Sequence, residues 1–86
     1  MLFRSAQLRD TPAGLLVLDV ADGGLAGSAG LAAGDLWISL AGVPIYTRGE
    51  LVALLRASAP AGKAELGWIR DGELMSGRGT FSGPGL

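Results

Sequence analysis

The sequence has no histidine and no cysteine among its 86 residues. Without these residues neither a Ser–His–Asp triad nor a Cys–His pair can form. A disulfide framework and a thiolate metal site are excluded for the same reason. Lys63 is the single lysine and stands at the expected solvent-facing start of a strand, so a Ser–Lys pair is not expected either. The sequence therefore predicts that this chain is not an enzyme by itself.

Any metal would have to be bound by carboxylates alone. The eight acidic residues are scattered along the chain. A site made only of carboxylates suits Ca²⁺ or Mg²⁺, and no loop has the ligand spacing that such a site requires. No metal and no cofactor is therefore expected.

Charge of either sign is scarce. Charged residues make up 17%, and seven basic against eight acidic residues leave a net charge of −1. This balance gives no basic footprint for nucleic acid or an anionic membrane. No apolar run approaches the roughly 18 residues that span a bilayer, and the first residues lack the apolar core of a signal peptide. We expect no nucleic-acid partner, no membrane insertion, and a chain that is either cytoplasmic or part of a longer protein.

Glycine and apolar residues, in contrast, are abundant. Fifteen glycines and four prolines indicate many turns between short elements, and 49% of residues are hydrophobic, which is typical of a globular chain. We predict one domain over residues 1–81. Residues 82–86, of composition Ser-Gly-Pro-Gly-Leu, are expected to form a flexible tail whose apolar Leu86 is a possible ligand for a neighbouring molecule.

The pattern of apolar residues and turn residues predicts a mainly β fold with one or two helices. Arg9 to Pro12 and the Asp-Gly pair at residues 71–72 are expected to be turns, the second within a hairpin. Trp37 and Trp68 are expected in the core, and Asp35 in a turn. The expected strands cover residues 1–8, 15–20, 36–40, 43–45, 63–69 and 74–81, with a short helical turn at 25–29 and a helix at about 48–58.

The helix at 48–58 has a clear start signal. Thr47 followed by Glu50 three residues later is a capping box. The apolar stripe of this helix is wider than one contact surface needs. We therefore expect one part of it to cover the core and the other part to line a groove. Leu51 and Leu54 are assigned to the core.

The stretch around Pro12 and the following apolar run suggest a binding site. The amides of Ala13, Gly14 and Leu15 are able to form a concave nest of donors, and such nests bind anions. If the strand at 15–20 lies at a sheet edge, an extended peptide could pair with it and place its terminal carboxylate in the nest.

The order of motifs resembles a bacterial PDZ domain of the kind found in HtrA/Deg-type serine proteases and related envelope proteases. The resemblance covers roughly residues 12–80. It implies a PDZ-like, partly open β-barrel or sandwich of five to six strands, capped by the helix near 48–58. The motifs that carry it are Ala13-Gly14-Leu15 before an apolar strand, Gly30-Leu31-Ala32-Ala33-Gly34-Asp35, Ala41-Gly42-Val43-Pro44-Ile45, the helix from Glu50 to Leu55, and Ile69-Arg70-Asp71-Gly72.

The resemblance also implies which residues bind a ligand. It makes Pro12 to Leu15 the carboxylate-binding loop, residues 15–19 the strand that pairs with the ligand, and three helix residues the opposite wall. The chain departs from the family pattern at two positions. Ala13 is smaller than the bulky apolar residue usual in that loop, and Ala41 replaces the usual asparagine. The expected peptide-binding residues are Ala13, Gly14, Leu15, Leu16, Val17, Arg48, Val52 and Leu55.

The predicted function is a peptide-binding module that recognises apolar C-terminal or extended segments by strand addition. Its expected covalent neighbour is a protease domain in a longer parent chain. If the chain belongs to such a parent protein, the expected location is the periplasm or the cell envelope. The alternative is a structural or assembly module of a secretion or membrane-protease complex, with no free-peptide ligand.

Overall fold

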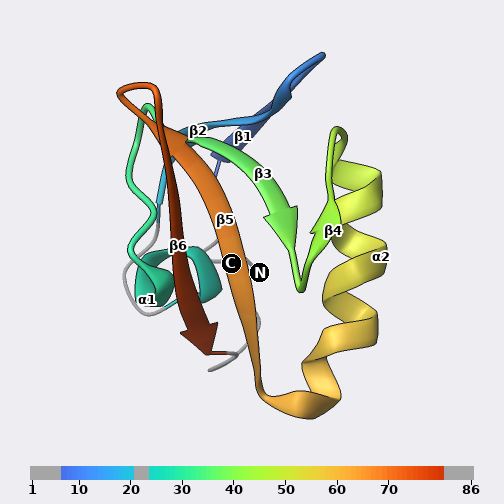
Figure 1. Cartoon of the computed structure of the whole chain (residues 1–86). Helices are drawn as coiled ribbons and strands as arrows, with labels where there is room; N and C mark the ends of the chain where they lie inside the picture. The colour runs from blue at the N-terminus through green and yellow to red at the C-terminus, as the bar shows by residue number, and fades with distance from the viewer. Residues whose placement is uncertain (1–6, 21–23, 81–86) are drawn as a thin grey trace.

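The computed structural model describes residues 7–20 and 24–80, which form an antiparallel sheet and two helices (Figure 1). The strand order is β1-β2-β3-β5-β6, and β4 pairs only with β3. A mainly β fold with two helices is therefore confirmed, whereas the predicted tail at 82–86 lies outside the described residues. The elements are β1 (Gln7–Thr11), β2 (Gly14–Asp19), α1 (Leu25–Ala29), β3 (Leu36–Leu40), β4 (Val43–Pro44), α2 (Arg48–Ser58), a 3-10 turn (Ala59–Ala61), β5 (Lys63–Arg70) and β6 (Glu73–Thr80).

The first strand is the main correction to the predicted elements. Residues 9–11 were expected in a turn but belong to β1, which pairs with β2 from Gln7↔Asp19 to Thr11↔Gly14. The turn is confined to Pro12 and Ala13. Much of the predicted strand at 1–8 lies outside the described residues. The consequence is a tight β1–β2 hairpin in place of a longer connection.

The core lies on one face of the sheet. Register places Leu15 opposite Trp37, Trp37 opposite Trp68, and Trp68 opposite Met75, so one row of large side chains crosses four strands. Both tryptophans are buried, as predicted, and the indole Nε1 of Trp37 donates to the Ser39 carbonyl at 2.8 Å. Helices α1 and α2 lie on opposite sides of β5 (Figure 1).

Two glycines of β6 allow α1 to approach the sheet closely. A Cβ atom at Gly77 would overlap the carbonyl oxygen of Ala29, and one at Gly79 would overlap that of Leu25. Both overlaps are with backbone atoms, which cannot rotate away as a side chain can. The glycine-rich composition of this strand is thus required by the packing of a helix against it.

Candidate functional site

Helix α2 begins with the predicted capping box. The Glu50 amide donates to Thr47 Oγ1 at 3.1 Å. In return Glu50 Oε1 accepts the amides of Thr47 at 3.0 Å and Tyr46 at 2.7 Å. Three backbone donors at the helix start are satisfied in this way, which fixes the position of the first turn.

One flank of α2 faces β1. Arg48, Val52 and Leu55 are spaced i, i+4, i+7 and therefore share one side of the helix. The Arg48 amide donates to Asp10 Oδ1 of β1 at 3.1 Å, and Arg48 Nε lies 3.9 Å from the same oxygen. Val52 is 45% exposed and Leu55 is half-buried, whereas Leu51 on the core side is buried. Arg48 is thus placed against β1, and Val52 and Leu55 follow it along the same side of the helix.

β1 is the terminal strand of the sheet on this side. It pairs with β2 along one edge, and within residues 7–20 and 24–80 no strand pairs with its other edge. A terminal strand presents a row of backbone donors and acceptors to which another strand can be added. The term "β1–α2 edge" is used below for this edge of β1 together with the α2 flank of Arg48, Val52 and Leu55.

The strand assigned to the ligand from the sequence does not offer such an edge. β2 pairs with β1 on one side, and on the other side Leu15 and Leu16 pair with β3. Val17 is also bonded there, since its amide donates to the Asp35 carbonyl at 2.9 Å and its carbonyl accepts the Gly34 amide at 2.8 Å. Over residues 15–17 both edges of β2 are occupied. The expectation that a ligand pairs with this strand is therefore corrected.

The side chains of β2 point to the same correction. Leu15 and Val17 are buried in the core, where they cannot line a ligand site, and Leu16 lies half-buried on the opposite face of the sheet. Strand β2 occupies an interior position because the β1–β2 hairpin places β1 outside it. No signal within residues 15–20 distinguishes an interior strand from an edge strand.

Two of the three amides of the predicted nest, those of Ala13 and Gly14, already have partners. Thr11 Oγ1 accepts the amides of Ala13 at 3.2 Å and Gly14 at 3.1 Å, and its hydroxyl donates to the Gly14 carbonyl at 2.7 Å. Pro12 and Ala13 form the tip of the β1–β2 hairpin, and the bonds from Thr11 make this segment a hairpin turn and not an anion-binding loop in this arrangement. The hydroxyl of Thr11, two residues before Ala13, is the signal that the sequence offered for this turn.

An ion pair between the buried Asp35 and the partly exposed Arg70 lies away from the β1–α2 edge. The Asp35 carboxylate, 3% exposed, accepts the Ala32 amide at 2.8 Å and two bonds from the Arg70 guanidinium at 2.7 and 2.9 Å. Arg70 also donates to the Gly30 carbonyl at 2.8 Å. These bonds from Arg70 hold the pKa of Asp35 below its usual value, against the opposing effect of burial, and the carboxylate raises the pKa of Arg70. The pair fastens the loop after α1 to the end of β5.

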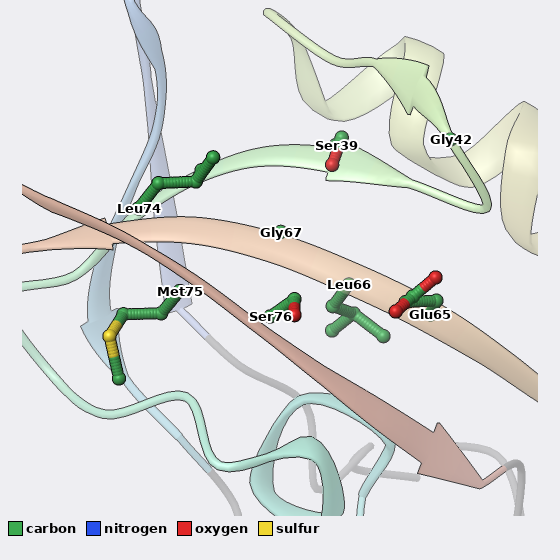
Figure 2. A pocket seen from close by; sticks show the side chains of 8 residues that line it. All are labelled: Ser39, Gly42, Glu65, Leu66, Gly67, Leu74, Met75 and Ser76. Atoms are coloured by element: carbon green, nitrogen blue, oxygen red, sulfur yellow. The ribbon is translucent and has the colours of Figure 1, made fainter.

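The described part of the chain contains a shallow hollow of about 340 Å³ on the sheet face opposite the core (Figure 2). None of the predicted peptide-binding residues lines it. Within the same described ranges, no three acidic residues are grouped to hold a metal ion, and no helix is long and apolar enough to cross a membrane. The hollow is lined by Ser39, Gly42, Glu65, Leu66, Gly67, Leu74, Met75 and Ser76.

Comparison with known proteins identifies the fold. The model of the PDZ domain family matches residues 16–70. A DegP-like periplasmic serine endoprotease of Ectopseudomonas mendocina is 43% identical over 63 residues, and one of Pseudomonas fluorescens is 42% identical over 64. These matches cover 73% and 74% of this chain, which spans only 13% of each protease.

Solved structures agree with this assignment. An aminopeptidase N family protein of Idiomarina loihiensis superposes with a TM-score of 0.80 at 30% identity, over 92% of this chain and 13% of its own. The PDZ domain of EpsC from Vibrio cholerae superposes with a TM-score of 0.68 at 22% identity, over 94% of this chain and 99% of its own. With the family model covering most of the sheet and α2, this chain belongs to the PDZ domain family.

Proposed function

We propose that this PDZ domain binds an extended peptide segment that adds as a strand to the β1–α2 edge. The observation that carries the proposal is that β1 is the terminal strand of the described sheet and that its Asp10 contacts Arg48, the first residue of the α2 flank that carries Val52 and Leu55. Backbone pairing with β1 would supply affinity for any extended segment. Contact with the α2 flank would supply selectivity for an apolar side chain.

Each helix residue has a distinct part in the proposal. Val52 and Leu55 provide an apolar surface against which a ligand side chain is buried. Arg48 is already paired with Asp10, both side chains being at least half exposed, at 68% and 50%. An acidic ligand residue would therefore compete with Asp10 for Arg48, and exposed charge pairs of this kind contribute only about 0.2–1 kcal/mol. Apolar contact is accordingly the main source of selectivity.

We further propose that the domain serves as the recognition or regulatory part of a longer protease. Support comes from the DegP-like serine endoproteases of which this chain matches a 13% segment. The chain has neither histidine nor cysteine, so it cannot supply a Ser–His–Asp triad on its own. In such a parent protein the peptide ligand would be a segment of a substrate or of a regulatory partner.

The experiment is a binding titration with fluorescent peptides. Peptides ending in leucine and in lysine, each with a free or an amidated C-terminus, are compared on the parent chain and on Val52→Asp. Burying the exposed part of a valine side chain contributes about 1 kcal/mol, and the added charge must also be desolvated. We expect the leucine peptide to bind more tightly than the lysine peptide and to lose at least tenfold in affinity on Val52→Asp.

Leu74→Ser is the matched control, because Leu74 is also an exposed apolar residue but lies on another face of the sheet. It should bind peptides as the parent chain does. Unchanged affinity in Val52→Asp would overturn the proposed site. Absence of binding by all the peptides would favour the alternative of an assembly module without a free-peptide ligand.

A further inference from the structure

The sheet face opposite the core carries an apolar row that no described element covers. Register pairs Leu16 with Leu36, Leu36 with Ile69, and Ile69 with Leu74. Directly paired residues point to the same face of a sheet, so these four side chains form one row across β2, β3, β5 and β6. Leu74 is 74% exposed, and the other three are half-buried. We call these four residues the outer row.

The continuous apolar sequence of β2 also indicates that both faces of the sheet are covered. Residues 15–18 are all apolar, although alternate side chains on a strand point to opposite faces. Leu15 and Val17 enter the core, whereas Leu16 and Leu18 lie on the outer face, where Leu18 is 45% exposed. Figure 2 shows Leu74 pointing toward β3, on the other side of β5 from Met75. Continuous apolar strands are typical of sheets covered on both faces.

We infer that the outer row is the contact surface for a second copy of this chain, with the two sheets packed face to face. Charge at the two ends of the row selects this occupant. Arg9 pairs with Leu16 at the β1 end, and at the other end the exposed Asp71 lies in the β5–β6 turn that joins Ile69 to Leu74. The row is therefore basic at one end, acidic at the other and apolar between them.

The charges also select the symmetry of the pair. A two-fold axis parallel to the strands places Leu16 over Leu74 of the second copy and brings Arg9 near its acidic β5–β6 turn. An axis along the row would instead place Arg9 over Arg9. Only the first arrangement satisfies both apolar contact and charge complementarity, and closed two-fold pairs are the commonest oligomers.

The size of the surface sets the expected affinity. Four strands about 4.8 Å apart, each contributing about five residues, give a footprint of roughly 300 Å² per copy. Stable complexes bury about 800 Å² on each partner. The dimer is therefore weak and reversible, and the net charge of −1 offers little long-range repulsion against it. We expect dissociation constants of roughly 0.1–1 mM. This inference does not depend on the proposed peptide site.

The test is sedimentation equilibrium on the full chain from about 20 μM to about 2 mM, a range that brackets the expected dissociation constant. The parent chain should rise toward the dimer mass. Leu74→Ser should raise the dissociation constant at least tenfold, and Arg9→Glu should weaken association, with recovery when it is combined with Asp71→Arg. Val52→Ser, which changes an exposed apolar residue on α2, is the matched control and should associate as the parent does.

Three results would overturn the inference. They are a parent chain that stays monomeric at the highest concentration, equal association of parent and Leu74→Ser, and loss of association only in Val52→Ser or in a chain lacking residues 83–86. The last result would assign self-association to the α2 flank or to the C-terminal residues. Tryptophan fluorescence of each variant checks that the fold is retained, since Trp37 and Trp68 are both buried.

Discussion

The Thr11 hydroxyl is predicted to hold the β1–β2 hairpin, and Thr11→Val isolates its contribution. Valine keeps the branched shape of threonine but loses the oxygen that accepts two amides and donates to one carbonyl. The Ala13 amide is exposed and can turn to water at little cost. Gly14 is buried, so its amide loses an acceptor and its carbonyl a donor without replacement by solvent.

The expected magnitude follows from these differences in exposure. A buried polar group left without its partner costs about 1–3 kcal/mol, and an exposed one much less. We therefore expect Thr11→Val to lower the free energy of unfolding by about 2 kcal/mol. A chain of this length has a total stability of roughly 4–13 kcal/mol. The corresponding fall in melting temperature is about 10 °C.

The assay is urea denaturation followed by tryptophan fluorescence, because both tryptophans are buried in the folded chain. Thr11→Ser is the control, since serine keeps the hydroxyl and removes only a methyl group. It should stay within about 0.5 kcal/mol of the parent, less than a typical net hydrogen bond. A Thr11→Val variant as stable as the parent, or a Thr11→Ser variant as unstable as Thr11→Val, would refute the reasoning.

Two further predictions concern polar contacts elsewhere in the chain. Arg70 lowers the pKa of Asp35 in the folded chain. The stability that the Asp35–Arg70 pair contributes is therefore complete above the pKa of Asp35 in the unfolded chain, about 3.8, and is lost as pH falls through the lower pKa of the folded chain. Asp35→Asn should therefore be less stable than the parent at pH 7, and the difference should shrink in denaturant titrations below pH 3.8; a constant difference would contradict it. Thr47→Ala removes the side-chain acceptor of the Glu50 amide and should cost about 1 kcal/mol in thermal or urea unfolding, and no loss would show that the cap contributes nothing.

Features fixed by a few neighbouring residues were determined by the sequence alone. The capping box predicted the start of α2, and the expected range of 48–58 is the observed one. The Asp71-Gly72 pair predicted the β5–β6 turn, because few residues adopt the positive φ values found at both positions. The short helix at 25–29 and the burial of Trp37 and Trp68 were also predicted correctly. The helix residues Arg48, Val52 and Leu55 were grouped from their spacing, and their role in binding stays a proposal.

Strand order, in contrast, was decided only by the tertiary structure. The apolar run at 15–20 predicts a strand. Whether that strand lies inside the sheet or at its edge depends on which other strands pair with it, and the residues of the run do not specify those partners. Here β1 extends to Thr11 and takes the terminal position, which moves the available edge from β2 to β1. The Asp35–Arg70 pair, 35 residues apart in sequence, likewise exists only because the fold brings the loop after α1 beside β5. Local hydrogen bonding and side-chain period are encoded in short stretches, whereas edges, faces and ion pairs of this kind follow from contacts between distant ones.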